Sequence, residues 1–124
     1  MNTPYRERIL DHYRHPRNRG GLPDADVSET LDNPVCGDVV HIDVNLRAGR
    51  VEEARFEGRG CVISMAAASM LTEMVQGKTL EELRTLTDSD FFEFLCITQG
   101  TVRAKCALLS LRALQKGLQK FEVT

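Results

Sequence analysis

Hydrophobic and polar residues alternate along two neighbouring segments in the first half of the chain. In residues 40–47 the even-numbered positions are apolar and the odd-numbered positions are polar, which is the period of a strand with one buried face. Ala48-Gly49 is suited to a turn, and a similar alternation follows in residues 51–57. The pattern predicts an antiparallel hairpin, with a brief further strand near residues 27–31.

A short amphipathic helix is predicted at the start of the sequence. Thr3 resembles an N-cap, Pro4 stands at the first helical position, and Pro16 prevents the helix from continuing. Residues 16–26 are rich in turn formers. We expect this segment to run extended over the surface.

The second half of the chain has helical spacing of its apolar residues. The predicted elements are a helix over residues 65–75 with Gly77 as its C-cap, a capping box formed by Thr79 and Glu82, a short helix over residues 87–95, and a long amphipathic helix over residues 104–121. A small sheet followed by helices indicates an α+β fold.

Composition narrows the class of protein. With 124 residues, the chain has the length of one domain, residues 1–124, and its 42% hydrophobic and 27% charged residues are typical of a soluble globular protein. A net charge of -2 supplies no field for nucleic acid and no basic patch for an anionic membrane. No apolar stretch is long enough for a membrane span or a signal segment, so a cytoplasmic location is expected.

Three of the four cysteines lie in breaks between predicted elements. Cys36 precedes a strand, and Cys61 and Cys106 stand at predicted helix starts. In a reducing compartment, thiols favour metal-binding or reactive roles over disulfides. The wide spacing of these cysteines does not match a zinc finger, whose ligands are paired within a few residues. Any shared site must therefore be built by the fold.

Helix starts favour the reactive form of cysteine. Unpaired N–H groups and the positive end of the helix dipole stabilise a thiolate, and Arg103 and Lys105 add positive charge beside Cys106. Asp38 is able to add an oxygen ligand if Gly37 lets the chain fold back. Three thiolates and one carboxylate would complete a tetrahedral zinc site. The alternative is that the cysteines are buried as small hydrophobic residues.

Other chemically suggestive residues have simpler interpretations. Cys96 ends an apolar helix face and is interpreted as a packing residue. His12, His15 and His41 are interpreted as ordinary surface histidines, with no role as ligands. The methionines with helical spacing, Met65, Met70 and Met74, are expected in the core.

Four segments together resemble the U-type iron-sulfur cluster assembly scaffold family, shared by Isc-type and Suf-type scaffolds. The segments are Pro16-Arg17-Asn18-x-Gly20, Asn33-Pro34-x-Cys36-Gly37-Asp38, Phe56-x-Gly58-x-Gly60-Cys61-x-Ile63-Ser64 and Arg103-x-Lys105-Cys106. The last motif is nearer the Suf-type branch, whereas the Isc-type branch has a histidine at the position of Lys105 and a Leu-Pro-Pro-Val-Lys motif upstream. The insertion usual in the Suf-type branch before the last cysteine is absent.

The resemblance implies a three-stranded antiparallel sheet with helices packed on it, and a set of ligands at one exposed end. By this resemblance Cys36, Asp38, Cys61 and Cys106 hold a zinc ion or a transient iron-sulfur cluster, most simply [2Fe-2S]. It also implies a pyridoxal-phosphate-dependent cysteine desulfurase as partner and apo iron-sulfur acceptor or carrier proteins as recipients. The first helix, with Tyr5 and Tyr13, is implied as a docking element.

Three hypotheses follow for the function. In the first, Cys106 or Cys61 accepts persulfide sulfur and a transient cluster is assembled on the site. In the second, the chain is a zinc-bound sulfur acceptor that activates the desulfurase without holding a cluster, with Arg103 and Lys105 in auxiliary roles. In the third, the metal is purely structural and the chain is a small binding module.

Overall fold

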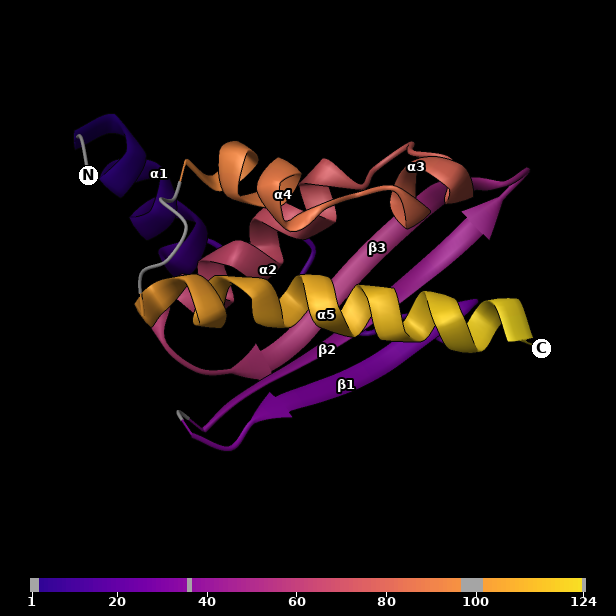
Figure 1. Ribbon diagram of the computed structural model, residues 1–124, viewed down its shortest axis with the longest axis horizontal. Coiled ribbons are helices and arrows are strands. Elements are labelled where there is room, and N and C mark those ends of the chain that lie inside the picture. Colours follow the sequence, from indigo (N-terminus) through magenta and orange to yellow (C-terminus); the bar gives the residue numbers. More distant parts are fainter. Residues whose placement is uncertain (1–2, 36, 97–101, 124) are drawn as a thin grey trace.

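A three-stranded antiparallel sheet is the base of the fold (Figure 1). The computed structural model describes residues 3–35, 37–96 and 102–123. The strands are β1 (Val27–Asn33), β2 (Asp38–Arg47) and β3 (Arg50–Arg59), in the order β1-β2-β3. The described helices are α1 (Thr3–Arg14), α2 (Val62–Met74), α3 (Leu80–Arg84), α4 (Asp88–Leu95) and α5 (Val102–Val123). The predicted α+β class is confirmed.

The register of the strands puts the predicted apolar positions on one face. Ile42 lies opposite Phe56, and Val44 lies opposite both Val27 and Ala54, with all five side chains buried. Side chains of alternating residues point to the same side of a sheet, so this face is covered while the other carries the polar positions.

A two-residue turn joins β2 to β3 where the sequence predicted it. Ala48 and Gly49 have φ angles of 53° and 76°, the left-handed conformation that tight hairpin turns with matching twist require at both positions. Arg47 pairs with Arg50 directly beside the turn. The hairpin register is therefore set by this turn.

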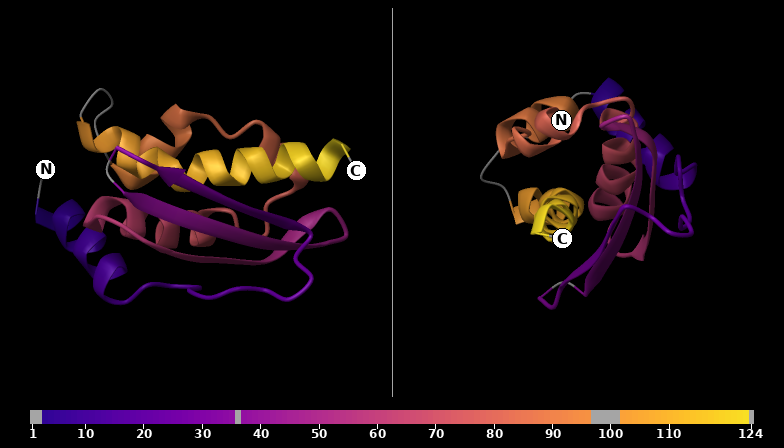
Figure 2. Two further views of the ribbon diagram at one scale, coloured as in Figure 1. Left: turned by 90° about the horizontal axis from the view of Figure 1, so that it is seen from below. Right: turned by 90° about the vertical axis from the view of Figure 1, so that its right-hand side faces the viewer.

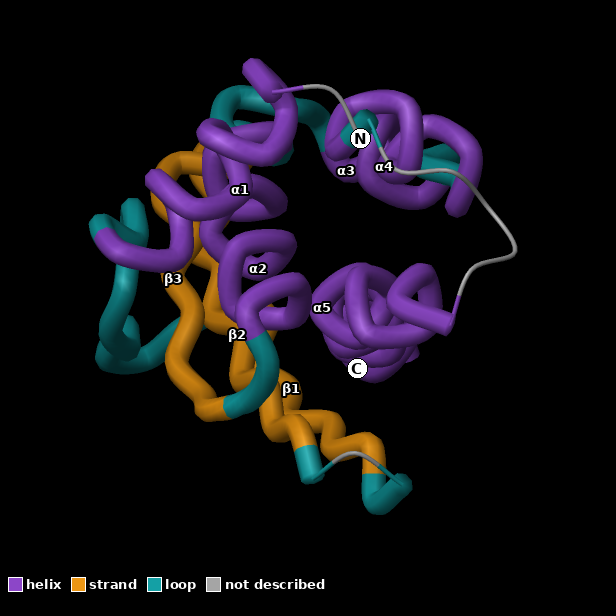
Figure 3. The backbone as a smooth tube through the Cα atoms, turned by 90° about the vertical axis from the view of Figure 1, so that its left-hand side faces the viewer, coloured by secondary structure: helices purple, strands orange, loops and turns teal. Residues whose placement is uncertain are grey.

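The helices α2 and α5 cover the apolar face of the sheet (Figure 2). The helix α5 packs on β1 and β2, while α2 packs on β3 and on α5. The helix α1 packs on α2, on the side away from α5 (Figure 3). None of the described helices combines the length and apolar character that a membrane crossing requires.

The segment after α1 runs along the sheet edge, as predicted. Arg19 forms a parallel bridge with Phe56, the Gly20 N–H donates to the Phe56 carbonyl over 2.7 Å, and the Phe56 N–H donates to the Asn18 carbonyl over 3.0 Å. These bonds satisfy main-chain groups of β3 that would otherwise face solvent.

The predicted C-cap of α2 is wrong by two residues. The helix ends at Met74 with Val75 as its C-cap, and Gly77 follows in the left-handed region with φ of 78°. The reason is a tie to the sheet: the Gly77 N–H donates to the Val51 carbonyl over 3.1 Å, and the Val51 N–H donates to the Lys78 carbonyl over 2.8 Å. The glycine shapes this connection to β3 instead of the helix end.

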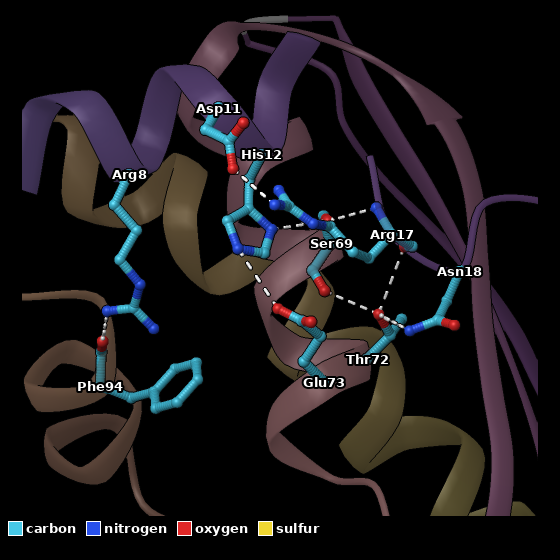
Figure 4. A network of polar contacts seen from close by, with 9 residues as sticks. All are labelled: Arg8, Asp11, His12, Arg17, Asn18, Ser69, Thr72, Glu73 and Phe94. Atoms are coloured by element: carbon cyan, nitrogen blue, oxygen red, sulfur yellow. Dashed lines mark hydrogen bonds and ion pairs between the residues drawn. The ribbon is translucent and has the colours of Figure 1, made fainter. Parts of the chain in front are cut away.

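The interpretation of His12 as a surface residue is also wrong. Its side chain is buried between α1 and α2, with Nδ1 2.8 Å from Oγ of Ser69 and Nε2 3.3 Å from Oε1 of Glu73 (Figure 4). The Arg17 N–H donates to the same serine hydroxyl over 2.8 Å. The sequence did not reveal that a small serine on α2 would leave room for this imidazole.

Candidate metal centre

Asp38, Cys61 and Cys106 meet at the end of the sheet where β2 begins and β3 ends, the end near the start of α5 (Figure 1). Asp38 is the first residue of β2, Cys61 lies between β3 and α2, and Cys106 lies on α5. One ligand atom from each of the three side chains lies within 4.8 Å of the others. The fold thus brings together residues that are widely separated in the sequence.

The Asp38 carboxylate is held from two sides. Its residue is only 2% exposed, Oδ1 accepts the Cys61 N–H over 3.1 Å, and Oδ2 accepts the Ser64 hydroxyl over 2.5 Å. A Cβ added at Gly60 would lie 2.6 Å from Oδ1, so a glycine is needed to leave this space. Gly37, with φ of 74°, precedes Asp38 in the turn from β1, as the sequence argument required.

Cys61 is the N-cap of α2, which agrees with its predicted place just before a helix, although the helix begins at Val62 and not at Met65. Its Sγ accepts the Ser64 N–H over 3.4 Å, which is a capping bond that a thiolate strengthens. The Cys61 side chain is half-buried and its thiol lies 3.6 Å from Oδ2 of Asp38. The helix start therefore gives this sulfur a main-chain hydrogen-bond donor.

Cys106 is not in the first turn of its helix, contrary to the prediction. The helix α5 begins at Val102, so Cys106 is its fifth residue. It therefore lies beyond the first turn, which is where a helix has unpaired N–H groups. The prediction was wrong because residues preceding Ala104 are also helical. Cys106 remains half-buried beside the other two residues, and its carbonyl oxygen lies 3.2 Å from Oγ of Ser64.

Ser64 is a site residue that sequence reasoning did not single out. It is 1% exposed and lies within hydrogen-bond reach of Asp38, Cys61 and Cys106. The signal that was available is its position three residues after the N-cap, where capping partners commonly stand.

The remaining predicted site residues have different placements. Cys36 lies outside the described residues, and so does the side chain of Arg103, whose main chain belongs to α5. Lys105 is exposed, one residue before Cys106. The packing role predicted for Cys96 is wrong, because this residue is the exposed C-cap of α4 in the left-handed conformation, with φ of 59°.

The donor set fits a metal ion. Two sulfur atoms and one carboxylate oxygen lie close enough to share one centre, and such donors suit zinc or iron. Burial of a carboxylate is costly unless it is hydrogen-bonded or paired with positive charge, and here two donors hold it in place. The role of these residues as ligands, and of Cys36 as the fourth, stays a prediction.

The fold and this cluster define a class: an α+β domain with a cysteine and aspartate centre at one end of its sheet. The family model described as NifU-like N terminal domain matches residues 4–124, so the chain belongs to that family. The resemblance identified from the sequence motifs is thereby confirmed.

Several curated relatives span most of the chain. The zinc-dependent sulfurtransferase SufU of Bacillus subtilis is 39% identical, over 98% of this chain and 94% of the relative. The iron-sulfur cluster assembly scaffold protein IscU 1 of Archaeoglobus fulgidus is 37% identical, over 92% and 74%. The IscU of Escherichia coli is 32% identical, over 95% and 94%. The SufU alignment spans 139 positions against 124 residues here, so that relative has residues this chain lacks.

Solved structures share the fold. The N-terminal part of a NifU-like protein from Brucella abortus has a TM-score of 0.77 over 97% of this chain and 95% of its own, at 23% identity. A protein described as an iron-sulfur cluster assembly scaffold for the SUF system, from Fervidobacterium islandicum, has a TM-score of 0.73 over 90% and 94%, at 25% identity. These neighbours confirm the sheet with helices on one face.

Proposed function

We propose that this chain, as one domain over residues 1–124, is an iron-sulfur cluster assembly protein that accepts persulfide sulfur from a pyridoxal-phosphate-dependent cysteine desulfurase. It assembles or relays a transient cluster on Cys36, Asp38, Cys61 and Cys106. The observation that carries this proposal is the set of three ligand atoms within 4.8 Å of one another. The names of its SufU and IscU relatives support the same sulfur and cluster chemistry.

The sulfur step needs only a thiolate of this chain and a persulfide of the partner. The thiolate of Cys106 or Cys61 attacks the outer sulfur of the desulfurase persulfide and forms a new sulfur-sulfur bond. The bond to the desulfurase cysteine breaks, and that cysteine leaves as a thiolate. Two features support an attack by these sulfurs: the Ser64 N–H donates to Sγ of Cys61, and the exposed Lys105 precedes Cys106 on α5.

A resident zinc ion is the alternative occupant of the same residues. It would supply positive charge that keeps its thiol ligands deprotonated. In that case the chain accepts sulfur and activates the desulfurase without holding a cluster. The zinc-dependent SufU relative and the lysine at position 105 support this alternative.

The cluster, as cargo, must leave for apo iron-sulfur acceptor or carrier proteins. Asp38 is a harder ligand than a thiolate, so a site with one carboxylate holds a cluster less firmly than four cysteines do. An exchangeable ligand supports transfer over permanent binding.

A mass measurement tests sulfur acceptance. The chain is mixed without oxygen with a cysteine desulfurase and cysteine, and the persulfide is trapped by alkylation. The wild-type chain and the control Cys96→Ser, whose cysteine is exposed at the end of α4, are expected to gain one sulfur atom. The double variant Cys61→Ser/Cys106→Ser is expected to gain none. Equal sulfur uptake by the double variant would contradict the proposal.

A stability measurement tests the hypothesis of a purely structural metal. For a metal with a structural role alone, Asp38→Ala unfolds the chain and metal removal denatures it. We expect instead that the metal-free chain keeps its unfolding transition and loses activation of the desulfurase. A chain that unfolds on metal removal and never takes up sulfur would support the structural alternative.

A further inference from the structure

We propose that Ser64 is a positioning residue that holds Asp38 as an exchangeable ligand and thereby sets the metal affinity of the site. This inference rests on the proposed function, because it assumes that Asp38 binds metal. Ser64 lies at the third position of α2 and is 1% exposed.

One hydroxyl links three structural elements. From α2 it donates to Oδ2 of Asp38 on β2 over 2.5 Å and lies 3.2 Å from the carbonyl oxygen of Cys106 on α5. The Cys61 thiol, at the start of the same helix, lies 3.5 Å from Oγ. Ser64 is thus in contact with all three described ligand candidates.

The Ser64 hydroxyl has one proton, and two acceptors lie within its reach: Oδ2 of Asp38 and the carbonyl oxygen of Cys106. The carboxylate takes it in the observed arrangement, because a charged acceptor at the shorter distance forms the stronger bond. The Cys106 carbonyl, 3.2 Å away, is a second acceptor for the same proton. The Ser64 hydroxyl therefore keeps an acceptor whether Asp38 binds a metal or releases it. A buried hydroxyl without an acceptor would be costly.

The same bond also fixes the direction of the carboxylate. The Cys61 N–H holds Oδ1 and the Ser64 hydroxyl holds Oδ2, so both oxygens have an assigned donor. Partners of this kind orient a metal ligand, and their loss typically weakens metal binding about 10- to 100-fold. Ser64→Ala removes the hydroxyl and keeps the main-chain N–H that donates to Sγ of Cys61.

The test is a zinc titration of the metal-free chain against a competing chelator. Ser64→Ala is expected to weaken zinc binding about 10- to 100-fold relative to the wild-type chain. The matched control is Ser69→Ala, because Ser69 is an equally buried serine of α2 whose hydroxyl contacts His12 and Arg17 instead. Ser69→Ala is expected to keep wild-type zinc affinity. A wild-type affinity for Ser64→Ala would overturn the inference.

A second background separates positioning from a general structural effect. If Ser64 acts through Asp38, then Ser64→Ala in an Asp38→Ala chain changes zinc affinity by less than about twofold, because the group it positions is gone. A full 10- to 100-fold loss in that background as well would overturn the inference. Failure of the wild-type chain itself to bind zinc or iron would instead overturn the proposed function, and this inference with it.

Discussion

The main-chain N–H of Cys61 donates a hydrogen bond to Oδ1 of Asp38 over 3.1 Å, joining two ligand candidates that are 23 residues apart. The bond connects the end of β3 to the beginning of β2 through the N-cap of α2. The Asp38 side chain is therefore tied to the main chain at the start of α2. Substitutions that disturb this bond should lower metal affinity more than they lower the stability of the fold.

Gly60→Ala is predicted to damage the site selectively. The added Cβ would lie 2.6 Å from Oδ1 and 2.7 Å from Cγ of Asp38, so the carboxylate side chain must move away. We expect zinc affinity to fall about tenfold or more, because the ligand loses its orientation. Chelator competition measures this loss, and wild-type affinity in Gly60→Ala would contradict the prediction.

Gly58→Ala is the matched comparison, and it is predicted to lower the stability of the fold. Its added Cβ would lie 2.1 Å from the main-chain oxygen of Val39, at a φ of 153° that suits glycine. A strand backbone cannot move aside as a side chain does, so the free energy of unfolding should fall by about 1–3 kcal/mol or more. Denaturant unfolding checks this, and an unchanged transition midpoint would show that the strands tolerate the added group.

His12 makes the stability of the protein depend on pH. Burial is the largest cause that lowers the pKa of His12. The positive charges of Arg17 and Arg8 lower this pKa further, whereas the negative charges of Glu73 and Asp11 raise it. As pH falls below about 6.5, the unfolded chain binds a proton that folded His12 resists, so the free energy of unfolding decreases. This contribution is present at neutral pH and is lost on acidification through that range.

The variant His12→Gln is expected to lack this part of the pH dependence. Unfolding by urea at about pH 7.5 and about pH 5.5 should give a smaller pH-dependent difference for His12→Gln than for the wild-type chain. His15→Gln, at an exposed position, serves as the control and should keep the wild-type difference. An identical difference in all three chains would refute the role assigned to His12.

Gly117→Ala is predicted to destabilise the protein, although alanine favours helices. Alanine is better than glycine by about 1 kcal/mol within a helix. However, a Cβ at Gly117 would lie 2.7 Å from Cγ1 of Val27 on β1, where α5 approaches the sheet closely. We expect the clash to outweigh the helical gain and to be relieved in Gly117→Ala/Val27→Ala. Thermal unfolding of the single and double variants tests this prediction. A higher unfolding midpoint in Gly117→Ala than in the wild-type chain would contradict the close packing of α5 on β1.

Lys105 and Arg103 are predicted to act on sulfur delivery without holding metal. Lys105 is exposed beside Cys106, and amines bearing positive charge are poor metal ligands at neutral pH. Lys105→Ala and Arg103→Ala should therefore keep the zinc content and slow sulfur uptake from the desulfurase. Loss of zinc together with sulfur uptake would contradict this division of roles.

The strands and most helices were predictable because their signals are local. The alternation in residues 40–47 and the turn at Ala48-Gly49 each depend on a few neighbouring residues, and the structure confirms both. The errors have a tertiary origin. Gly77 hydrogen-bonds to Val51 of β3, and buried His12 contacts the hydroxyl of Ser69 on another helix. Periodicity along the chain carries no information on such contacts.

Three of the four predicted site residues lie together in the structure, whereas the hydrogen bonds that hold them were not predicted. Asp38, Cys61 and Cys106 were identified by residue type, glycine neighbours and family motifs, and the fold gathers them. Ser64 was overlooked because a serine three residues after a cysteine has no distinctive chemistry until the chain folds. Its contact with Asp38 joins α2 to β2, and only the three-dimensional arrangement reveals it.

The most direct test of the central claim is the content of zinc, iron and acid-labile sulfide per chain, after purification without oxygen. The wild-type chain is predicted to carry metal, with iron and sulfide for the scaffold or zinc alone for the sulfur acceptor. Asp38→Ala, Cys61→Ser and Cys106→Ser are each predicted to lose most of it, and Cys96→Ser to keep it. Equal metal content in all five proteins would contradict a shared centre at Asp38, Cys61 and Cys106.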